Sequence, residues 1–309
     1  MHHSFPLDVI QTLDPERDHS EICRLSMGYA FFWETTRALE YALLKTFCVP
    51  SIAGLLDQTQ EFAKRPQKRY DDTGFIITKI LQHGYKTPEG GAVLERMNRI
   101  HRRYSIANND YLYVLSTFIY EPIRWNGRFG WRPFCDAEKL ALYYFWQAVG
   151  DRMGIEQIPS TYEKFEQFNQ TYEKQHLRYS AANQRVGDAV LEMVLGWFPN
   201  WMRSPVKSHV YACLDDPMLI ALGWPRPTLR QRRRVIGLLK LRQRWVRLWP
   251  ARKQDGFEPY YAQLRSYPSG VTLAQVGPPP LLNQLNQLNQ ASPREARCPF
   301  HRLMQVTPK

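Results

Sequence analysis

The sequence predicts an all-α fold, built as a single multi-helix domain. Apolar residues recur at helical spacing over much of the chain, and capping or breaking residues stand between these stretches. No run shows the sustained two-residue alternation with tight turns that is typical of strands. With 309 residues, 44% of them hydrophobic, the chain can bury a sizeable core, so we expect many helices around one core.

The predicted helices follow one another between capping residues and residues that end helices. Pro50 is expected to end the helix at 33–47, and Gly84 the helix at 70–82. Pro122 is expected to end the next-but-one helix, and the prolines between 199 and 227 to break that part into short pieces. In chain order, helices are predicted at 18–29, 33–47, 70–82, 88–104, 111–120, 137–149, 162–195 (with interruptions) and 229–248.

Composition divides the chain into three parts. Residues 1–19 form a polar N-terminal extension, and 20–267 form the helical domain. Residues 268–309 contain a Gly-Pro-Pro-Pro run and a repeat of Asn, Gln and Leu, neither of which has a core-forming pattern. We therefore expect 268–309 to be a loosely packed or partly disordered tail.

The net charge of +12 is concentrated in one segment. Residues 226–253 hold 11 of the 41 basic residues and no acid, so the remaining chain is nearly neutral. The predicted helix in this segment also has an apolar stripe, formed by Leu229, Ile236, Leu239, Trp245 and Leu248. Packing of this stripe on the body and contact with an anionic membrane are the two favoured interpretations. Nucleic-acid binding is less favoured, because no nucleic-acid fold signature accompanies the arginines.

The cysteines and the N-terminus bear on the cellular compartment. Five cysteines lie far apart without a CxxC pair, which favours free thiols in a reducing compartment over disulfides or a zinc site. The N-terminus has no apolar run of the kind found in signal peptides, and no stretch of 18 apolar residues occurs. We therefore expect a cytoplasmic protein without a transmembrane helix, with peripheral membrane contact through 226–253 left open.

His101 differs from the other histidines because it lies with the apolar stripe of its helix. Val93, Met97, Ile100 and His101 follow helical spacing. A buried histidine needs partners, since an unpaired polar group in a core costs about 1–3 kcal/mol. A lone inward histidine is more often a hydrogen-bonded core residue than a ligand, and both interpretations stay open at this point.

Two groups of polar residues could serve a cofactor bound at His101. Arg69 and Thr73 are four residues apart in a helical stretch and so share a face, with Asp72 between them. A haem needs an apolar slot, one axial donor, cations for its propionates and a polar distal group, and this chain can supply all four. Arginine-rich helix surfaces are also common without any cofactor. The arginines on the predicted helix of His101 are Arg96, Arg99, Arg102 and Arg103.

Several stretches resemble the oxygenase family that contains the fungal endoplasmic-reticulum-bound oxygenases of mycophenolic acid synthesis, with bacterial rubber-cleaving oxygenases as more distant members. The order of the stretches is more specific than any one of them. The likeness covers most of residues 20–280. Its strongest parts are Lys68-Arg-Tyr-Asp-Asp-Thr73, Arg96-Met-Asn-Arg-Ile-His101, Ile106-Ala-Asn-Asn-Asp-Tyr-Leu-Tyr-Val-Leu115 and Tyr120-Glu-Pro-Ile-Arg-Trp125.

The resemblance implies an all-α protein that binds haem b and uses dioxygen to cleave or oxidise a carbon–carbon double bond in a lipophilic, isoprenoid substrate. The position that matches the proximal iron ligand is His101, and the distal Arg and Thr fall on Arg69 and Thr73. Where the rubber oxygenases have a lysine before that threonine, this chain has Asp72, which we predict to alter the chemistry of the pocket. Their upstream glutamate base has no convincing match in Asp57 or Glu61.

Three hypotheses follow from the sequence. The leading one is a haem-dependent oxygenase with Arg69, Asp72 and Thr73 in the pocket and His101 on the iron. The second keeps the haem as part of a non-catalytic sensor, because of Asp72 and the missing base. The third is a cofactor-free helical protein that binds an anionic membrane or nucleic acid through 226–253.

Overall fold

The computed structural model describes residues 5–248, 254–279 and 282. These residues form helices and no strands, so the predicted all-α fold is confirmed. The helices in chain order are α1 (Leu7–Ile10), α2 (His19–Cys23), the π-helix η1 (Arg24–Ala30), α3 (Phe32–Thr46), α4 (Pro50–Thr59), α5 (Glu61–Lys64), α6 (Pro66–His83), α7 (Pro88–His101), α8 (Asn108–Phe129), α9 (Asp136–Met153), α10 (Tyr162–His176), α11 (Ala181–Leu195), α12 (Asn200–Cys213), α13 (Asp216–Ala221), α14 (Leu229–Val246), α15 (Phe257–Tyr261) and the 3₁₀-helix η2 (Leu273–Gln275).

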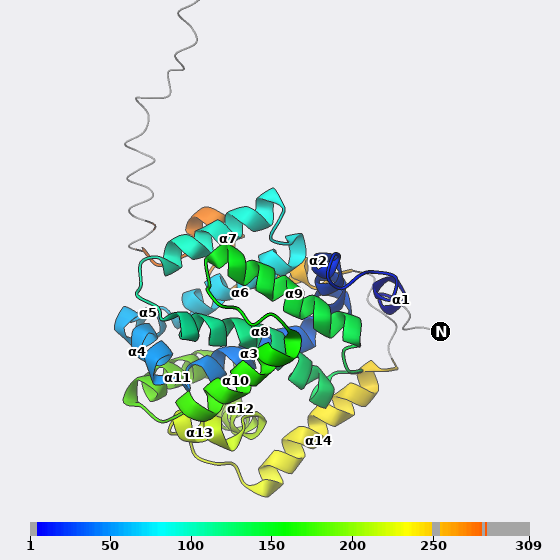
Figure 1. The fold of residues 1–309 in the computed structure, drawn as a ribbon. Coiled ribbons are helices and arrows are strands. Elements are labelled where there is room, and N and C mark those ends of the chain that lie inside the picture. The colour runs from blue at the N-terminus through cyan, green and yellow to red at the C-terminus, as the bar shows by residue number, and fades with distance from the viewer. Residues whose placement is uncertain (1–4, 249–253, 280–281, 283–309) are drawn as a thin grey trace, which may run out of the picture.

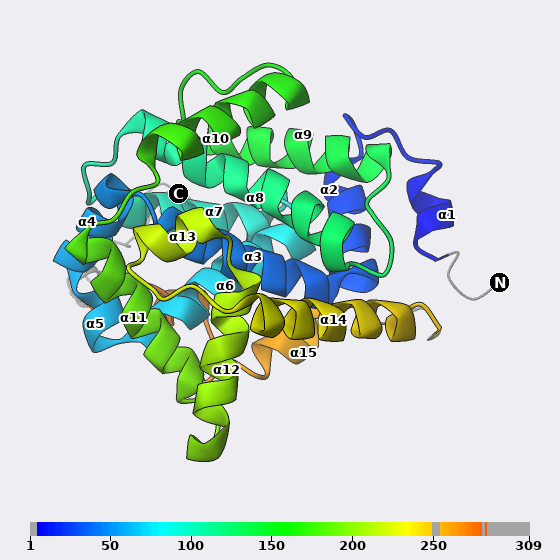
Figure 2. The ribbon, with the colours of Figure 1, turned by 90° about the horizontal axis from the view of Figure 1, so that it is seen from below.

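Helix α8 lies at the centre of the molecule (Figures 1 and 2). It packs against α3, α9 and α10, and its Tyr113, Ser116 and Tyr120 are fully buried. Helices α6 and α7 pack against each other in one half, whereas α11 to α13 gather in the other half (Figure 1). Helix α6 contributes to both halves, because Phe75 belongs to one core cluster and Tyr70 packs against the other. Residues on α6 are therefore well placed to face a site between the two.

Pro122 lies inside α8, so the prediction that it ends this helix is wrong. Proline removes one backbone hydrogen bond and crowds the carbonyl four residues earlier, which makes it costly inside a helix. Here the helix continues to Phe129, and both Trp125 and Phe129 are buried against α3 and α11–α14 residues of the second core cluster. Packing of the last two turns offsets the cost of the proline, as tertiary contacts commonly override local propensity.

Two further helix predictions need correction in the second half of the chain. The segment 162–195 forms two helices, α10 and α11, which residues 177–180 separate. Ser180 begins α11, because its hydroxyl accepts a hydrogen bond from the Asn183 backbone N–H at 3.1 Å. The prolines after 199 do not produce only short pieces: α12 has 14 residues and continues through Pro205.

Helix α14 lies along the outside of the molecule in both views (Figures 1 and 2). Its buried side chains are Val235 and Leu239, and Ile236 packs against the same core. The predicted apolar stripe therefore packs only in its middle. Its other members are exposed: Leu229, Trp245 and Leu248.

Parts of the predicted extension and tail pack on the helical body. In the extension, His19 bonds the Tyr85 hydroxyl at 2.6 Å. In the tail, Val276 is fully buried, and most of 280–309 lies outside the described residues.

Among the described helices, none by itself has the length and apolar composition needed to cross a membrane. The pair α3–α4, which is bent by 94°, meets that test by length and composition alone.

Candidate functional site

Arg69 and Thr73 lie one turn apart on α6 and contact each other. The helix begins at Pro66, where proline is favourable because a first-turn N–H has no partner in the helix. The Arg69 guanidinium donates a hydrogen bond to Thr73 Oγ1, and the Thr73 hydroxyl donates to the Arg69 carbonyl oxygen at 2.9 Å. The guanidinium also lies 5.4 Å from the centre of the Phe62 ring, and burial lowers its pKa. The two side chains thus form the pair that their spacing predicted.

His101 is the last residue of α7 and faces inward, as its helical spacing predicted. Its Nδ1 is buried and has no hydrogen-bond partner among the described residues. The ring lies edge-on to Tyr111, with 5.7 Å between ring centres. Burial, and then the charge of Arg69, lower the pKa of His101 to about 4. The imidazole is therefore neutral near pH 7, which is the state in which histidine binds a metal.

Asp72, between Arg69 and Thr73 in the sequence, contacts the C-terminal segment. Its carboxylate accepts hydrogen bonds from Lys68 Nζ at 2.8 Å, from the Gly277 backbone N–H at 3.0 Å and from the Tyr267 hydroxyl. Three donors satisfy a buried carboxylate, so Asp72 holds residues 267–277 against α6. Its predicted role in the chemistry of the pocket stays a prediction.

The four arginines near His101 have different surroundings. Arg96 is buried, and its guanidinium donates to the carbonyl oxygens of Val276 at 2.8 Å and Ala274 at 3.3 Å. Arg99 pairs with Glu95 at 3.0 Å on the surface. The side chains of the other two, Arg102 and Arg103, are exposed.

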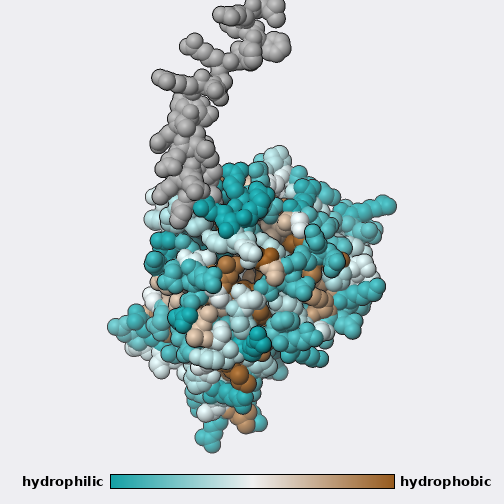
Figure 3. Space-filling model, turned by 60° about the vertical axis from the view of Figure 1, so that its left-hand side comes forward, coloured by the Kyte–Doolittle hydropathy of each residue, from teal (hydrophilic) through white to brown (hydrophobic). Residues whose placement is uncertain are grey.

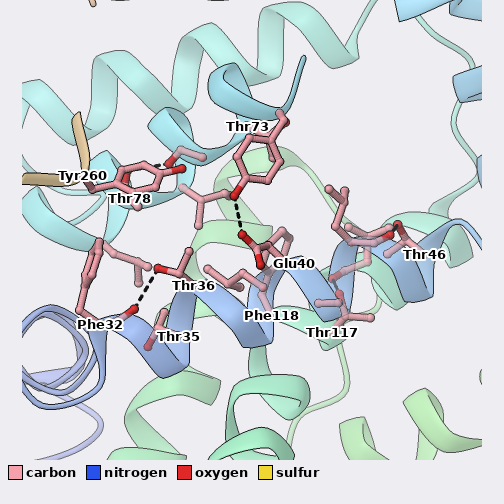
Figure 4. Close-up of a pocket in the computed structure, with 18 of the residues that line it drawn as sticks. Phe32, Thr35, Thr36, Glu40, Thr46, Thr73, Thr78, Thr117, Phe118 and Tyr260 are labelled. Atoms are coloured by element: carbon pink, nitrogen blue, oxygen red, sulfur yellow. Dashed lines mark hydrogen bonds between the residues drawn. The ribbon is translucent and has the colours of Figure 1, made fainter. Parts of the chain in front are cut away.

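A largely apolar cavity with an empty volume of about 770 Å³ lies between α3, α6, α8 and α15. We call it the Thr73 cavity, because Thr73 is the predicted site residue in its wall (Figure 4). Neither Arg69 nor His101 lines it, although Tyr111, which His101 contacts, lies one turn before the lining residue Val114 on α8. The wall consists of Phe32, Thr35, Thr36, Leu39, Glu40, Ala42, Leu43, Thr46, Tyr70, Thr73, Gly74, Ile77, Thr78, Leu81, Val114, Thr117, Phe118, Phe257 and Tyr260.

Glu40 is a carboxylate in the wall of the Thr73 cavity that the sequence did not single out. It accepts a hydrogen bond from the Tyr70 hydroxyl at 2.5 Å, drawn in Figure 4, and another from Arg37 at 2.6 Å. Burial raises the pKa of Glu40, although the charge of Arg37 opposes this. A spacing of three residues makes Arg37 and Glu40 a recognisable helix pair, but no sequence signal links either to Tyr70. The two carboxylates considered from sequence lie elsewhere, since Asp57 pairs with Arg185 and Glu61 with Arg65.

A second and larger cavity, with an empty volume of about 1240 Å³, shares Glu40, Leu43 and Tyr70 with the first. We call it the tryptophan cavity, because four indoles line it. Apolar side chains also gather around a hollow on the surface in Figure 3. The four indoles belong to Trp33, Trp125, Trp197 and Trp224.

The polar groups in the wall of the tryptophan cavity differ in whether they have partners. The indole of Trp197 donates to Gln67 at 2.6 Å, and the indole of Trp224 donates to Asp188 at 2.7 Å. The buried indole nitrogen of Trp125 has no partner among the described residues. His209 also lines the wall, and burial lowers its pKa.

The residues around His101 fit a prosthetic group that needs a single protein ligand. Within the ranges that the structure describes, no three His, Cys, Asp or Glu side chains gather as a metal cage. His101 offers one buried nitrogen without a partner, near a cation and a hydroxyl on α6. One imidazole together with a polar group beyond it is the ligand set that haem b uses in many proteins.

Residues 36–248 match the model of a family described as the ER-bound oxygenase mpaB/B'/rubber oxygenase catalytic domain. The chain belongs to this family. An ER-bound oxygenase mpaB of Penicillium roqueforti (strain FM164) is 28% identical over 220 residues, which are 65% of this chain and 72% of the relative. An ER-bound oxygenase mpaB' of Penicillium brevicompactum is 26% identical, over 61% of this chain and 49% of the relative. An ER-bound oxygenase mpaB of the same organism is 28% identical, over 50% of this chain and 44% of the relative.

Membership of the mpaB/rubber oxygenase family supports an oxygenase function and so an oxidoreductase. The chain spans about half the length of the two P. brevicompactum relatives. The matched range includes Arg69, Thr73 and His101, and also the basic helix α14. Tyr267 and Gly277, which hold Asp72, lie beyond it.

Proposed function

We propose that this chain is a haem b-dependent oxygenase that oxidises or cleaves a carbon–carbon double bond in a lipophilic, isoprenoid-like substrate. The observation that carries the proposal is the buried, unpartnered nitrogen of His101, whose pKa burial and the charge of Arg69 lower. Oxygenase family membership supports the reaction class.

His101 would hold the iron through its neutral imidazole, which needs no deprotonation near pH 7. Bound haem b would supply the activation of dioxygen, which no side chain can perform. Arg69 would keep a positive charge near the bound group, and its hydrogen bond would hold the Thr73 hydroxyl at the cavity wall. Because burial weakens the competition from water, the Arg69 guanidinium would act strongly on a negative charge that develops near it.

The Thr73 cavity would bind the substrate. Apart from Glu40 and several hydroxyls, its wall is hydrocarbon or aromatic, as the walls of small-molecule sites commonly are. Such a wall would exclude water and orient a flexible alkene chain beside Thr73. A polar or charged substrate would lose hydration without finding enough partners.

Glu40 would be the group that accepts or returns a proton. It is the carboxylate in the wall of the Thr73 cavity, and burial raises its pKa toward the range that suits acid–base work. Its bonds to Tyr70 and Arg37 would fix its orientation, and Tyr70 would offer a hydroxyl through which a proton could pass.

Oxygen uptake by the haem-loaded protein tests the proposal. Farnesol is a suitable probe, and its fully saturated analogue is the matched control, because the two differ only in the double bonds. Of the two compounds, we expect only farnesol to cause oxygen consumption and to give a carbonyl product. Equal rates with both compounds would contradict oxidation at a double bond.

A haem-binding sensor is the second candidate, because Asp72 is occupied by structural contacts and Glu40 already has two partners. A protein that binds haem and dioxygen but consumes no oxygen with any unsaturated isoprenoid alcohol would favour the sensor. Turnover with any of them would exclude it.

A further inference from the structure

Helix α14 presents an outer stripe to solvent, opposite the face that packs on the body. We define the outer stripe by its exposed side chains, which recur at the spacing of one helix face. Its apolar members are between 58% and 85% exposed. The stripe consists of Arg230, Arg233, Arg234, Leu238, Leu241, Arg244, Trp245 and Leu248.

The arginines of α14 divide into two sets. Those that turn inward are neutralised: Arg232 pairs with Asp216 at 2.8 Å, and Arg242 pairs with Glu34 at 2.7 Å. Those on the outer stripe, together with Lys240, form no ion pair within the part of the chain that the structure describes. Since residues 226–253 contain no acid, this surface carries an uncompensated positive charge.

The inner face of α14 fixes the helix on the body. Val235 and Leu239 are buried, and the Arg242 guanidinium lies 3.5 Å from the centre of the Trp33 ring. The Gln243 amide donates to the Gly130 carbonyl oxygen at 2.7 Å. The outer stripe is therefore presented by a helix that is already folded and anchored, so binding does not have to fold it first.

We propose that the outer stripe of α14 docks the protein on an anionic lipid bilayer. Leucine and tryptophan side chains bury favourably at the boundary of head groups and acyl chains, while arginines on the same helix meet the phosphates. Nucleic acid would use the cations but would leave the exposed leucines and Trp245 without a role. A second copy of this chain would bring two strongly basic surfaces together, which charge repulsion disfavours.

Docking by this face would place the tryptophan cavity close to the lipid. Leu239 lies on the inner side of α14 and lines that cavity. An α-helix with its side chains is about 10 Å across, so only the thickness of α14 would separate the cavity from the bilayer. The docking proposal itself needs neither haem nor catalysis.

Vesicle co-sedimentation of the full chain tests the proposal, with phosphatidylcholine vesicles that contain or lack phosphatidylserine. One variant removes charge from the outer stripe (Arg233→Gln, Arg234→Gln, Arg244→Gln), and a second removes its apolar side chains (Leu238→Ser, Leu241→Ser, Trp245→Ser). The control Lys164→Gln, Lys174→Gln, Arg178→Gln removes the same number of exposed positive charges from α10 and the turn after it. Circular dichroism establishes that all variants are folded.

The wild type and the control should bind the phosphatidylserine vesicles. The charge variant should bind on the order of 100-fold more weakly, since each basic residue near such a surface contributes about a factor of five. The apolar variant should also lose binding. Unchanged binding by either stripe variant, or an equal loss in the control, would overturn the proposal.

Two other results would overturn it as well. One is RNA binding that the apolar variant retains, without binding to vesicles. The other is a concentration-dependent dimer that the stripe variants abolish, again without binding to vesicles. Haem content is measured separately from its absorption, so failure of the docking proposal and failure of the proposed function are distinguishable.

Discussion

Arg69 and His101 come from different helices, yet the charge of Arg69 is, after burial, the second cause that lowers the pKa of His101. Helices α6 and α7 pack against each other, and this packing brings Arg69 and the end of α7 to one site. It keeps the imidazole neutral and places a permanent cation near it. A neutral imidazole binds a metal without competition from protons near pH 7.

The Thr73 hydroxyl links Arg69 to the wall of the cavity. Replacement Thr73→Val keeps the shape and removes the hydroxyl that holds the Arg69 guanidinium. We expect kcat to fall about 10- to 100-fold while haem still binds, since loss of one preorganised donor costs this much or more. Thr73→Ser should retain most of the activity. Steady-state oxygen uptake measures both, and equal rates for Val and Ser would show that the hydroxyl has no part in the reaction.

Glu40 should control the acidic side of the pH profile. Burial raises its pKa, and a base must be deprotonated to act, so kcat of the wild type should fall as the pH drops through that raised pKa. In Glu40→Gln, kcat should be lower and this dependence should disappear. Glu34→Gln is the matched control, because Glu34 is buried on the same helix but pairs with Arg242. An unchanged acidic limb in Glu40→Gln would assign the limb to another group.

Asp72 should matter for stability. Asp72→Ala removes the acceptor for Lys68, Tyr267 and Gly277, and we expect a loss of about 2–3 kcal/mol in the free energy of unfolding. Urea denaturation measures this. Asp136→Ala removes an exposed carboxylate paired with Lys139 and should change stability little. If both variants were equally stable, the contacts of Asp72 would not hold the C-terminal segment in place.

The buried His19 should make the protein less stable in mild acid. Burial lowers its pKa below 6.5 in the folded state, so below that pH the unfolded chain binds the proton first. Stability from this group is therefore present above pH 6.5 and falls as the pH drops toward the folded pKa, by at most about 1.4 kcal/mol per pH unit. In His19→Gln the dependence of unfolding free energy on pH should be shallower between about pH 5 and 7. An identical dependence would exclude His19 as a source.

The sequence predicted helices best where one apolar stripe and clear ends agree, as in 33–47, which forms α3. The helix predicted at 70–82 has the expected end, but α6 begins four residues earlier, at Pro66. The prediction failed at Pro122 and Pro205, where local rules favour an end but the helix continues. At Pro122 the reason is the burial of Trp125 and Phe129, which depends on helices far away in the chain. Such packing has no local signature.

Only part of the candidate site can likewise be predicted from local sequence patterns. Arg69 and Thr73 follow from a spacing of four residues on one helix, and the inward direction of His101 follows from the apolar pattern around it. Glu40 and Tyr70 meet only because α3 packs beside α6, which spacing within either helix does not encode.

Absorption spectroscopy of the protein titrated with haem tests whether His101 binds haem iron. We expect that the wild type develops a Soret band with one haem per chain, that pyridine treatment identifies haem b, and that His101→Ala loses the ligated spectrum. His209→Ala is the matched control, because His209 is also half-buried with a lowered pKa but lines the tryptophan cavity. Its spectrum should equal that of the wild type. Absence of haem binding by the wild type, or an unchanged spectrum in His101→Ala, would contradict haem ligation by His101.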